Sequence, residues 1–293
     1  MAAEISTLPA QAGAGWKPPE VLRRLLRHRL FVVGAVLLLA VVAVVLLAPW
    51  LAPYDPVKND YRYRLGAPVA AHWLGTDSFG RDVLSRTLYG GVVSLRIGFF
   101  VMLFTGVIGT LIGLSAGYFR RLEAPIMRLM DALMAFPGVL LAIALAAVLG
   151  PSERNVIIAL VVTYVPRTAR IMRAAALVVS ELEYVQAARA VGASHLRILV
   201  KHIGANSLAP LIVQMTFIFA IAILAEALLS FVGVGPQPPM PTWGNIIADG
   251  RDFIPEAPWI CLFPGLFVAM SVLGLNLIGD GLRDVLDPRL KEN

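Results

Sequence analysis

The stretch "LFVVGAVLLLAVVAVVLLAPWL", residues 30–51, decides the fold class, because it contains no charged residue. An α-helix needs about 20 consecutive apolar residues to cross the hydrocarbon core of a bilayer. Similar apolar segments lie at 92–119, 124–149, 155–179, 208–232 and 259–279. Their lengths suit helices better than the strands of a barrel, which span a membrane in about ten residues. The sequence therefore predicts an all-α membrane protein with six transmembrane helices.

The composition leads to the same class. The chain has 293 residues, of which 58% are hydrophobic and 15% are charged, whereas soluble domains carry about 25% charged residues. Its single cysteine, Cys261, lies in an apolar segment and excludes an intrachain disulfide. The sequence contains no Walker A loop, no GxSxG motif and no His/Cys ligand spacing. We therefore expect no catalytic residue, no metal site and no cofactor bound by this chain.

The distribution of Lys and Arg predicts the orientation, because cytoplasmic loops carry an excess of both. With the N-terminus inside, the cytoplasmic segments hold 17 of the 25 basic residues, the external segments hold 7, and Arg96 lies within a span. We therefore expect both termini to be cytoplasmic, and no nucleic-acid partner is needed to explain the charge of +6. The expected parts are a cytoplasmic tail (1–29), a first span with its external loop (30–90), a five-helix core (91–280) and a second tail (281–293).

Few charged residues fall within the predicted spans, and these are functional candidates because a charge in the membrane is costly. Glu226 lies in the middle of the fifth span, where either an interhelical hydrogen bond or a point on a transport pathway would explain it. Asp131 is expected to pair with Arg128, three residues earlier. Three arginines share one face of the fourth span: Arg167, Arg170 and Arg173. They would lie at the interface, pair within the bundle or line a polar cavity, and we take Arg167 and Glu226 as pathway candidates.

Two loop features and one helix face add detail to this topology. "GVIGTLIGLSAGYF", residues 106–119, spaces Gly109, Gly113 and Gly117 four apart, which lets another helix approach closely. A short interfacial helix is expected at 77–88 in the first external loop. The prolines of "GPQPPMPTWGN", residues 235–245 in the second external loop, exclude a regular helix there.

A polar stretch, "EYVQAARAVGASHLRILVKHI", residues 183–203, interrupts the apolar pattern. Gly192 suits a turn with positive φ, and Ser194 can cap a following helix. That helix carries an apolar stripe at i, i+3, i+4 and i+7: Leu196, Leu199, Val200 and Ile203. The pattern predicts a helix–turn–helix on the cytoplasmic side. A solvated linker remains open, as does a docking element for a partner. A DNA-binding motif is disfavoured because no third helix completes its core.

This stretch resembles the "EAA" loop of importer-type ABC permeases, with Gln186, Ala187, Ala188 and Gly192 in the matching places. Gln186 replaces the usual Glu, and Gly204-Ala205 replaces a common Leu-Pro. Four further segments resemble the C-type subunit of the dipeptide/oligopeptide/nickel permease family: "HWLGTDSFGRDVLSR" (72–86), "MRLMDALMAFP" (127–137), "LLSFVGVGPQPPMPTWGNII" (228–247) and "GDGLRDVLDPRL" (279–290). The resemblance covers about residues 20–291.

The resemblance implies a type I ABC importer permease fold in a prokaryotic inner membrane, with the EAA loop at about 181–205. It also implies a homologous B-type permease, two cytoplasmic ATPase subunits that bind ATP and Mg²⁺, and an external solute-binding protein that delivers a peptide. The residues it implies for ATPase docking are Gln186, Ala187, Ala188, Gly192, Ala193, Leu196 and Arg197. Nickel chelates or glutathione are alternative substrates, and an ion-coupled secondary carrier or a membrane-bound scaffold is an alternative class. Changing Gln186 to the usual Glu is expected to be nearly neutral.

Overall fold

The computed structural model describes residues 18–286, and the described chain is helical, without named strands. Five helices are long and apolar enough to cross a membrane. They are α2 (Arg29–Leu46), α4 (Val83–Tyr118), α7 (Glu153–Ser180), α10 (Leu208–Val232) and α12 (Trp259–Leu286). The shorter elements are α1 (Pro18–Arg27), α3 (Ala48–Leu51), η1 (Tyr61–Tyr63), α5 (Arg120–Met134), α6 (Gly138–Leu149), α8 (Glu183–Ala190), α9 (His195–Arg197), η2 (Ile198–Gly204), α11 (Trp243–Gly250) and η3 (Arg251–Phe253).

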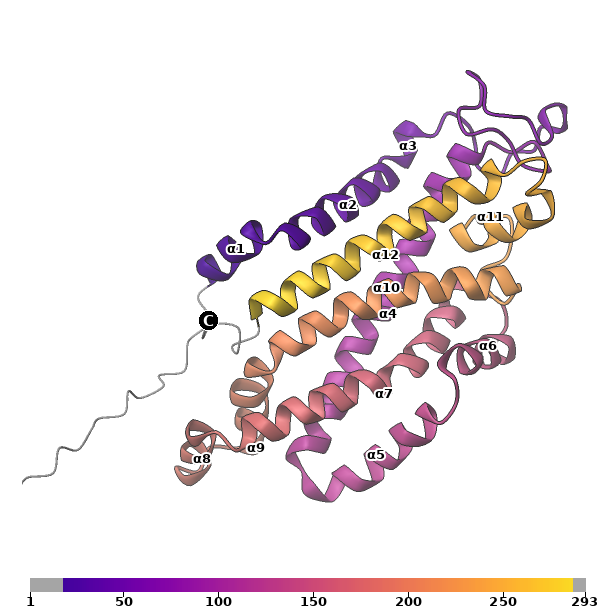
Figure 1. The fold of residues 1–293 in the computed structure, drawn as a ribbon. Coiled ribbons are helices and arrows are strands. Elements are labelled where there is room, and N and C mark those ends of the chain that lie inside the picture. Colours follow the sequence, from indigo (N-terminus) through magenta and orange to yellow (C-terminus); the bar gives the residue numbers. More distant parts are fainter. Residues whose placement is uncertain (1–17, 287–293) are drawn as a thin grey trace, which may run out of the picture.

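The third predicted span is divided into α5 and α6, which meet at an angle of 88°. The break follows from Pro137, because proline lacks an N–H group and disfavours helical geometry in the residue before it. Figure 1 shows that this bent pair carries the chain from the end of α4 to the opposite end of the molecule, where α7 begins. With the bent pair counted as one span, residues 18–286 contain the six spans that the sequence predicts.

The second span begins earlier than predicted, and the expected separate helix at 77–88 is wrong. Residues 77–82 form a loop, and Val83 begins the 36-residue helix α4. Asp82 starts this helix, because its carboxylate accepts a hydrogen bond from the backbone N–H of Ser85 at 2.8 Å. The predicted boundary between residues 90 and 91 therefore falls inside α4.

The ends of the chain are partly described. Within the predicted N-terminal tail (1–29), residues 18–27 form α1, and residues 1–17 lie outside the described range. Within the predicted C-terminal tail (281–293), α12 continues to Leu286, and residues 287–293 lie outside that range. Figure 1 shows α1, the end of α12, α8 and α9 at one end of the molecule, and η1 and α11 at the other.

Close helix contacts at glycine hold the bundle together. A Cβ atom added to Gly109 would lie 2.7 Å from Cβ of Thr168, and one added to Gly113 would lie 2.6 Å from Cβ of Met172. The predicted glycine face of α4 thus packs directly against α7. At the other side of the bundle, a Cβ on Gly34 of α2 would lie 2.7 Å from the Gly274 carbonyl oxygen of α12.

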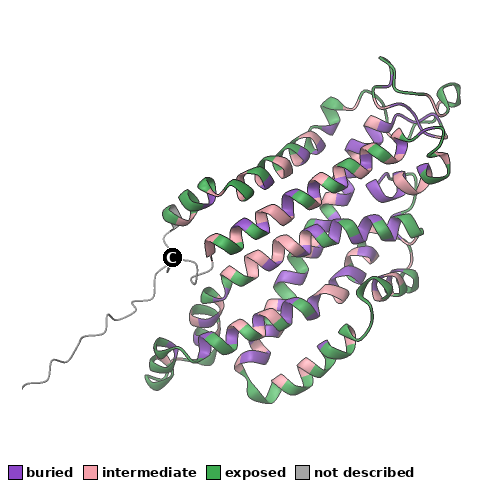
Figure 2. Ribbon diagram, viewed as in Figure 1, coloured by how far each residue is buried: buried purple, intermediate pink, exposed green. Residues whose placement is uncertain are grey.

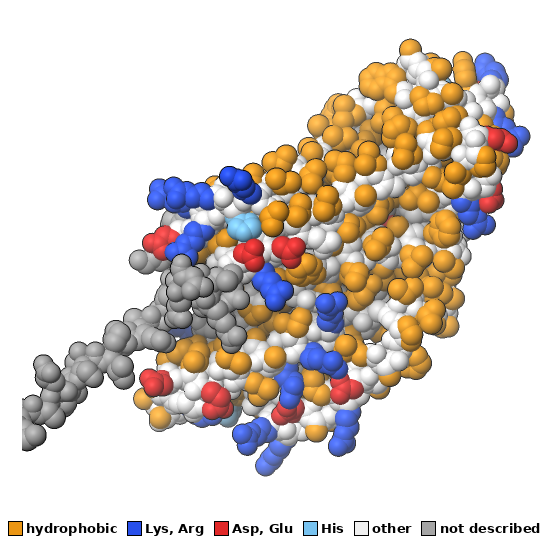
Figure 3. All heavy atoms as spheres, in the orientation of Figure 1, with side chains coloured by type: hydrophobic (Ala, Val, Ile, Leu, Met, Phe, Trp, Pro, Cys, Tyr) orange, Lys and Arg blue, Asp and Glu red, His pale blue; other side chains and the backbone are white. Residues whose placement is uncertain are grey.

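Much of the surface is apolar. In Figure 1, α2, α12, α10 and α7 lie side by side in front of the crossing helix α4. Figure 2 shows exposed residues along the outer faces of these helices, and Figure 3 shows that most side chains there are hydrophobic. Contiguous apolar surface of this extent requires lipid or other protein subunits to cover it.

Candidate functional site

The polar stretch at residues 183–204 comprises α8, a turn, α9 and η2. We call it the docking loop, after the role that the sequence leads us to expect. Gly192 has φ +80° in the turn, and the Ala193 N–H donates to the Ala188 carbonyl at 3.0 Å. Ser194 caps α9 by accepting a hydrogen bond from the Arg197 N–H at 3.4 Å. The predicted helix–turn–helix, the positive φ at Gly192 and the cap at Ser194 are confirmed.

The buried side of the docking loop differs from the predicted stripe. Ile198 and Ile203 are fully buried, whereas Leu196 and Val200 are exposed. The cause is η2, a π-helix, in which residues five apart recur on one face. Together with Val185, the two isoleucines pack against α4 and α7 through a cluster that includes Leu114, Met172, Ala176 and Val179. The loop is therefore seated on these two spans.

The outer side of the docking loop carries the residues expected to dock a partner. Gln186, Ala187, Gly192, Leu196 and Arg197 are exposed, and Ala188 and Ala193 are half-buried. Leu196 is 72% exposed, and Val191 beside the turn is 84% exposed. Exposed apolar side chains next to small residues, at a polar end of a membrane protein, suit contact with another protein.

Hydrogen bonds connect the docking loop to the ends of α4 and α7. The Gln186 side-chain amide donates to the Ser180 carbonyl at 2.9 Å. The Tyr118 hydroxyl lies 2.8 Å from Nδ1 of His195, and the Arg189 guanidinium lies over the Tyr118 ring, 5.7 Å from its centroid. Because α4 and α7 also pack against each other, these contacts connect the loop to the centre of the bundle.

Two of the four arginines of α7 form ion pairs with α5. Arg170 lies 2.6 Å from the Asp131 carboxylate, and Arg173 pairs with Glu123. The predicted pairing of Asp131 with Arg128 is wrong, because α5 turns Asp131 toward the neighbouring helix. Among residues 18–286, no three His, Cys, Asp or Glu side chains lie close enough to hold a metal ion.

Glu226 lies in an interhelical network, and its side chain is 0% exposed. Its carboxylate accepts hydrogen bonds from the hydroxyls of Ser94 and Ser230, each at 2.7 Å. The Ser94 hydroxyl also accepts the backbone N–H of Trp243 at 3.2 Å. The network joins α4, α10 and α11, so the structure favours the interhelical alternative over a place on a pathway.

Arg167 lies at a small cavity of about 220 Å³ between α7, α10 and α12, with a mostly apolar lining. Gln214 and Asn276 also line this cavity, which we call the Arg167 cavity. The sequence interpretation missed both residues. Their signal was available, because each is an uncharged polar side chain within an apolar span. The structure thus brings Arg167 together with two amides and places Glu226 elsewhere.

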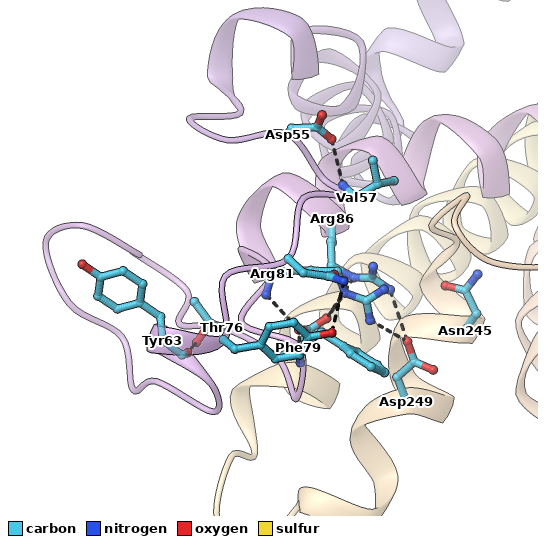
Figure 4. A network of polar contacts seen from close by, with 12 residues as sticks. Asp55, Val57, Tyr63, Thr76, Phe79, Arg81, Arg86, Asn245 and Asp249 are labelled. Atoms are coloured by element: carbon cyan, nitrogen blue, oxygen red, sulfur yellow. Dashed lines mark hydrogen bonds and ion pairs between the residues drawn. The ribbon is translucent and has the colours of Figure 1, made fainter.

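The opposite end of the molecule is closed by a second set of ion pairs, drawn in Figure 4. Arg81 lies 2.6 Å from Asp77 and 3.2 Å from Asp249, and Arg86 lies 3.3 Å from Asp249. Asp249 belongs to α11, a helix that begins directly after the proline-rich segment of the second external loop. In the same region the Arg62 guanidinium, by hydrogen bonding, lowers the pKa of Asp60. The ion pairs that Asp77 and Arg81 form with Arg86 and Asp249 fasten residues 52–82 onto α4 and α11.

The bundle of apolar helices, with a loop of amphipathic helices seated on α4 and α7, defines a multi-pass membrane protein. The chain matches the family model for the binding-protein-dependent transport system inner membrane component over residues 109–292. It also matches the model for the N-terminal TM domain of oligopeptide transport permease C over residues 19–68.

Relatives match along nearly their whole length. A Brucella abortus protein, named for a peptide transport system permease, is 55% identical over 94% of each chain. The dipeptide transport system permease protein of Alkalihalophilus pseudofirmus is 44% identical, over 93% of this chain and 90% of its own. The glutathione transport system permease protein of Pectobacterium atrosepticum is 42% identical, over 99% and 97%.

The chain belongs to the family of binding-protein-dependent transport system inner membrane components, and within it to the C-type oligopeptide permeases. It is therefore a permease subunit of an ABC importer and a multi-pass protein of the inner membrane. This membership sets aside the secondary carrier and the scaffold as alternatives.

Proposed function

We propose that this chain forms half of the translocation pathway of an ATP-driven importer of di- and oligopeptides, and that its docking loop binds one ATPase subunit. The observation that carries the proposal is the form of the loop. Its inner side is buried against α4 and α7, while its outer side presents Leu196 and Val191 to solvent. An element with one anchored and one unpartnered face can transmit a partner's movement to the helices beneath it.

The complex contains a homologous B-type permease, two cytoplasmic ATPase subunits and an external solute-binding protein. ATP and Mg²⁺ bind to the ATPase subunits, and this chain holds no cofactor. Both chain termini and the docking loop face the cytoplasm, in keeping with the excess of Lys and Arg in those segments. The end closed by Asp77, Arg81, Arg86 and Asp249 faces outward and receives the binding protein.

Coupling then works as a two-state equilibrium biased by a ligand at a distance. ATP binding draws the ATPase subunits together, and each docking loop moves with the subunit that it contacts. The buried pair Ile198 and Ile203, with the hydrogen bond from Gln186, passes that displacement to α4 and α7. The two permeases change from inward-facing to outward-facing, and hydrolysis resets them.

Peptides are the substrate favoured by the names of the relatives with the higher identities. A glutathione permease is nearly as similar, at 42% identity, and glutathione is itself a small peptide. Glutathione is therefore the second candidate substrate. The solute-binding protein, a separate chain, would make most of the choice between them.

The test is a Gly192→Asp variant in the assembled importer. Nothing lies within 4 Å of a Cβ added at Gly192, and aspartate tolerates positive φ better than most residues. The variant should therefore insert and join the partner permease. The new charge on the docking surface should abolish ATP-driven peptide uptake in reconstituted vesicles and reduce co-purification of the ATPase subunits.

Gly233→Asp is the matched control, because Gly233 also has positive φ and open space around its Cβ but lies at the other end of the molecule. It should keep the ATPase subunits bound and the ATPase activity normal. Normal uptake by Gly192→Asp would contradict the docking role. ATP-independent uptake by the unmodified complex would contradict the ABC mechanism for this chain.

A further inference from the structure

The Arg167 cavity gathers hydrogen-bond donors from three spans. Arg167 comes from near the midpoint of α7, Gln214 from α10 and Asn276 from α12. The rest of the lining is mostly apolar, including Phe217, Ile221, Leu224 and Val272. Figure 3 shows basic side chains lying among apolar ones over α7, on the face turned toward the viewer. Arg167, which is exposed, thus borders a cavity into which the buried Gln214 and half-buried Asn276 also face.

The donors in this cavity lack acceptors within the described chain. Arg170 and Arg173 pair with carboxylates of α5, whereas no carboxylate of the described residues lies within 4.0 Å of the Arg167 guanidinium. Gln214 is 5% exposed, and its side-chain Nε2 has no hydrogen-bond partner. A buried donor without a partner destabilises a fold, and a charge within a span does so more strongly. An acceptor that arrives during function would explain why both are present.

The chemistry of the donors specifies that acceptor. A guanidinium presents parallel N–H groups that match the two oxygens of a carboxylate, and side-chain amides add neutral donors beside it. No acidic side chain lines the cavity to repel an anion. The volume of about 220 Å³ is below the roughly 300–1,000 Å³ of pockets that enclose a whole small ligand. The cavity therefore suits one end of a ligand that extends beyond it.

We propose that the Arg167 cavity binds the terminal carboxylate of the peptide as it passes through the membrane. The proposal rests on the peptide-import function above and adds a chemical determinant within this subunit. Dipeptides and glutathione both carry a free carboxylate, so the same site serves either substrate. The apolar walls accept the side chains of the peptide without selecting among them. This suits an importer of peptides that differ in sequence.

The experiment compares alanylalanine with its C-terminal amide in vesicles that contain the whole importer, ATP and enough binding protein to be saturated by each probe. The unmodified complex should favour the free acid. Arg167→Gln should lower uptake of the free acid roughly tenfold or more, because a hydrogen bond to a charged group is lost, and should leave the amide nearly unaffected. Gln214→Leu should act in the same direction with a smaller change.

Arg154→Gln is the matched control, since Arg154 lies on the same helix but outside the cavity. It should preserve the preference for the free acid. If the unmodified complex takes up neither probe with ATP, the import function itself is overturned. If the unmodified complex imports the probes, and Arg167→Gln keeps both the uptake rate and the preference for the free acid, only the carboxylate site is overturned. Loss of the partner permease on purification of Arg167→Gln would show that a carboxylate of that subunit pairs with Arg167, which also overturns the proposal.

Discussion

At the scale of single residues, the hydrogen bond from Gln186 changes the expected effect of Gln186→Glu, which restores the residue usual in EAA loops. Gln186 donates its amide to the Ser180 carbonyl, and an ionised glutamate has no proton to donate. The near-neutral outcome expected from the sequence for Gln186→Glu is therefore revised. The bond contributes about 1 kcal/mol, so we expect the transport-coupled ATPase rate of the complex to fall a few-fold.

The control for this substitution is another glutamine that donates to a backbone carbonyl, at the other end of the molecule. Gln237 donates its amide to the Gly233 carbonyl at 3.1 Å, and Gln237→Glu should leave the coupled ATPase rate unchanged. Equal rates for Gln186→Glu and the unmodified complex would show that this hydrogen bond does not transmit force from the docking loop.

Glu226 offers a second test at this scale, in which stability is measured. Glu226→Leu would leave the hydroxyls of Ser94 and Ser230 without their acceptor, at roughly 1–3 kcal/mol for each buried group. Glu226→Gln keeps an acceptor oxygen and should cost much less. In mild detergent, the purified complex with Glu226→Leu should have a clearly lower melting temperature than the complex with Glu226→Gln. A Gln variant as unstable as Leu would show that the negative charge itself is required.

Residue roles could be predicted where the cause is local. The positive φ of Gly192 and the cap at Ser194 follow from the residue type and its immediate neighbours. The partner of Asp131 could not be found in this way, because Arg170 is brought near it by the packing of α5 on α7. The sequence marks Gln214 as a polar residue within an apolar span, but its position beside Arg167 depends on the packing of α10 on α7.

At the scale of elements, the contact of α4 with α7 depends on the absence of side chains. A Cβ on Gly113 would overlap the Ala169 carbonyl oxygen and lie 2.6 Å from Cβ of Met172. Overpacking of this kind costs about 1–3 kcal/mol, so Gly113→Ala should lower the melting temperature of the purified protein. Gly265→Ala is the control, because nothing lies within 4 Å of its Cβ in α12. Equal melting temperatures would mean that α4 and α7 separate readily.

Some helix boundaries likewise follow from local sequence, and others depend on packing between distant segments. The fifth span was predicted at the residues that α10 occupies, because apolar length alone decides it. The bend between α5 and α6 has a local signal in Pro137, but its angle of 88° depends on packing against α7. The π-helix η2 has no periodic signal in the sequence, so the predicted stripe of the docking loop was displaced.

At the scale of the whole molecule, orientation is the property to measure. In a Cys261→Ser background, we expect Lys58→Cys to react with a membrane-impermeant maleimide from outside. Val191→Cys, which is 84% exposed in the unmodified chain, should react only after the membrane is permeabilised. These expectations follow from the excess of Lys and Arg at the docking-loop end. The reverse labelling pattern would place the docking loop outside and exclude contact with a cytoplasmic ATPase.

The membrane class and the number of spans could be predicted because both depend on apolar length. The seating of the docking loop on α4 and α7 could not, since it depends on contacts between segments far apart in sequence, such as Leu114 with Ile198.

The contact between Gly34 and Gly274 has a consequence for biosynthesis. These glycines join α2, which leaves the ribosome before the other described spans, to α12, which leaves it after them. Until α12 is inserted, the Gly34 face of α2 lacks the helix that covers it. That face is then in contact with lipid or with the insertion machinery. The described bundle therefore closes only after α12 has been made. A nascent chain that stops after α10 would present α2 without its main helix partner, a feature by which membrane quality control can recognise incomplete synthesis.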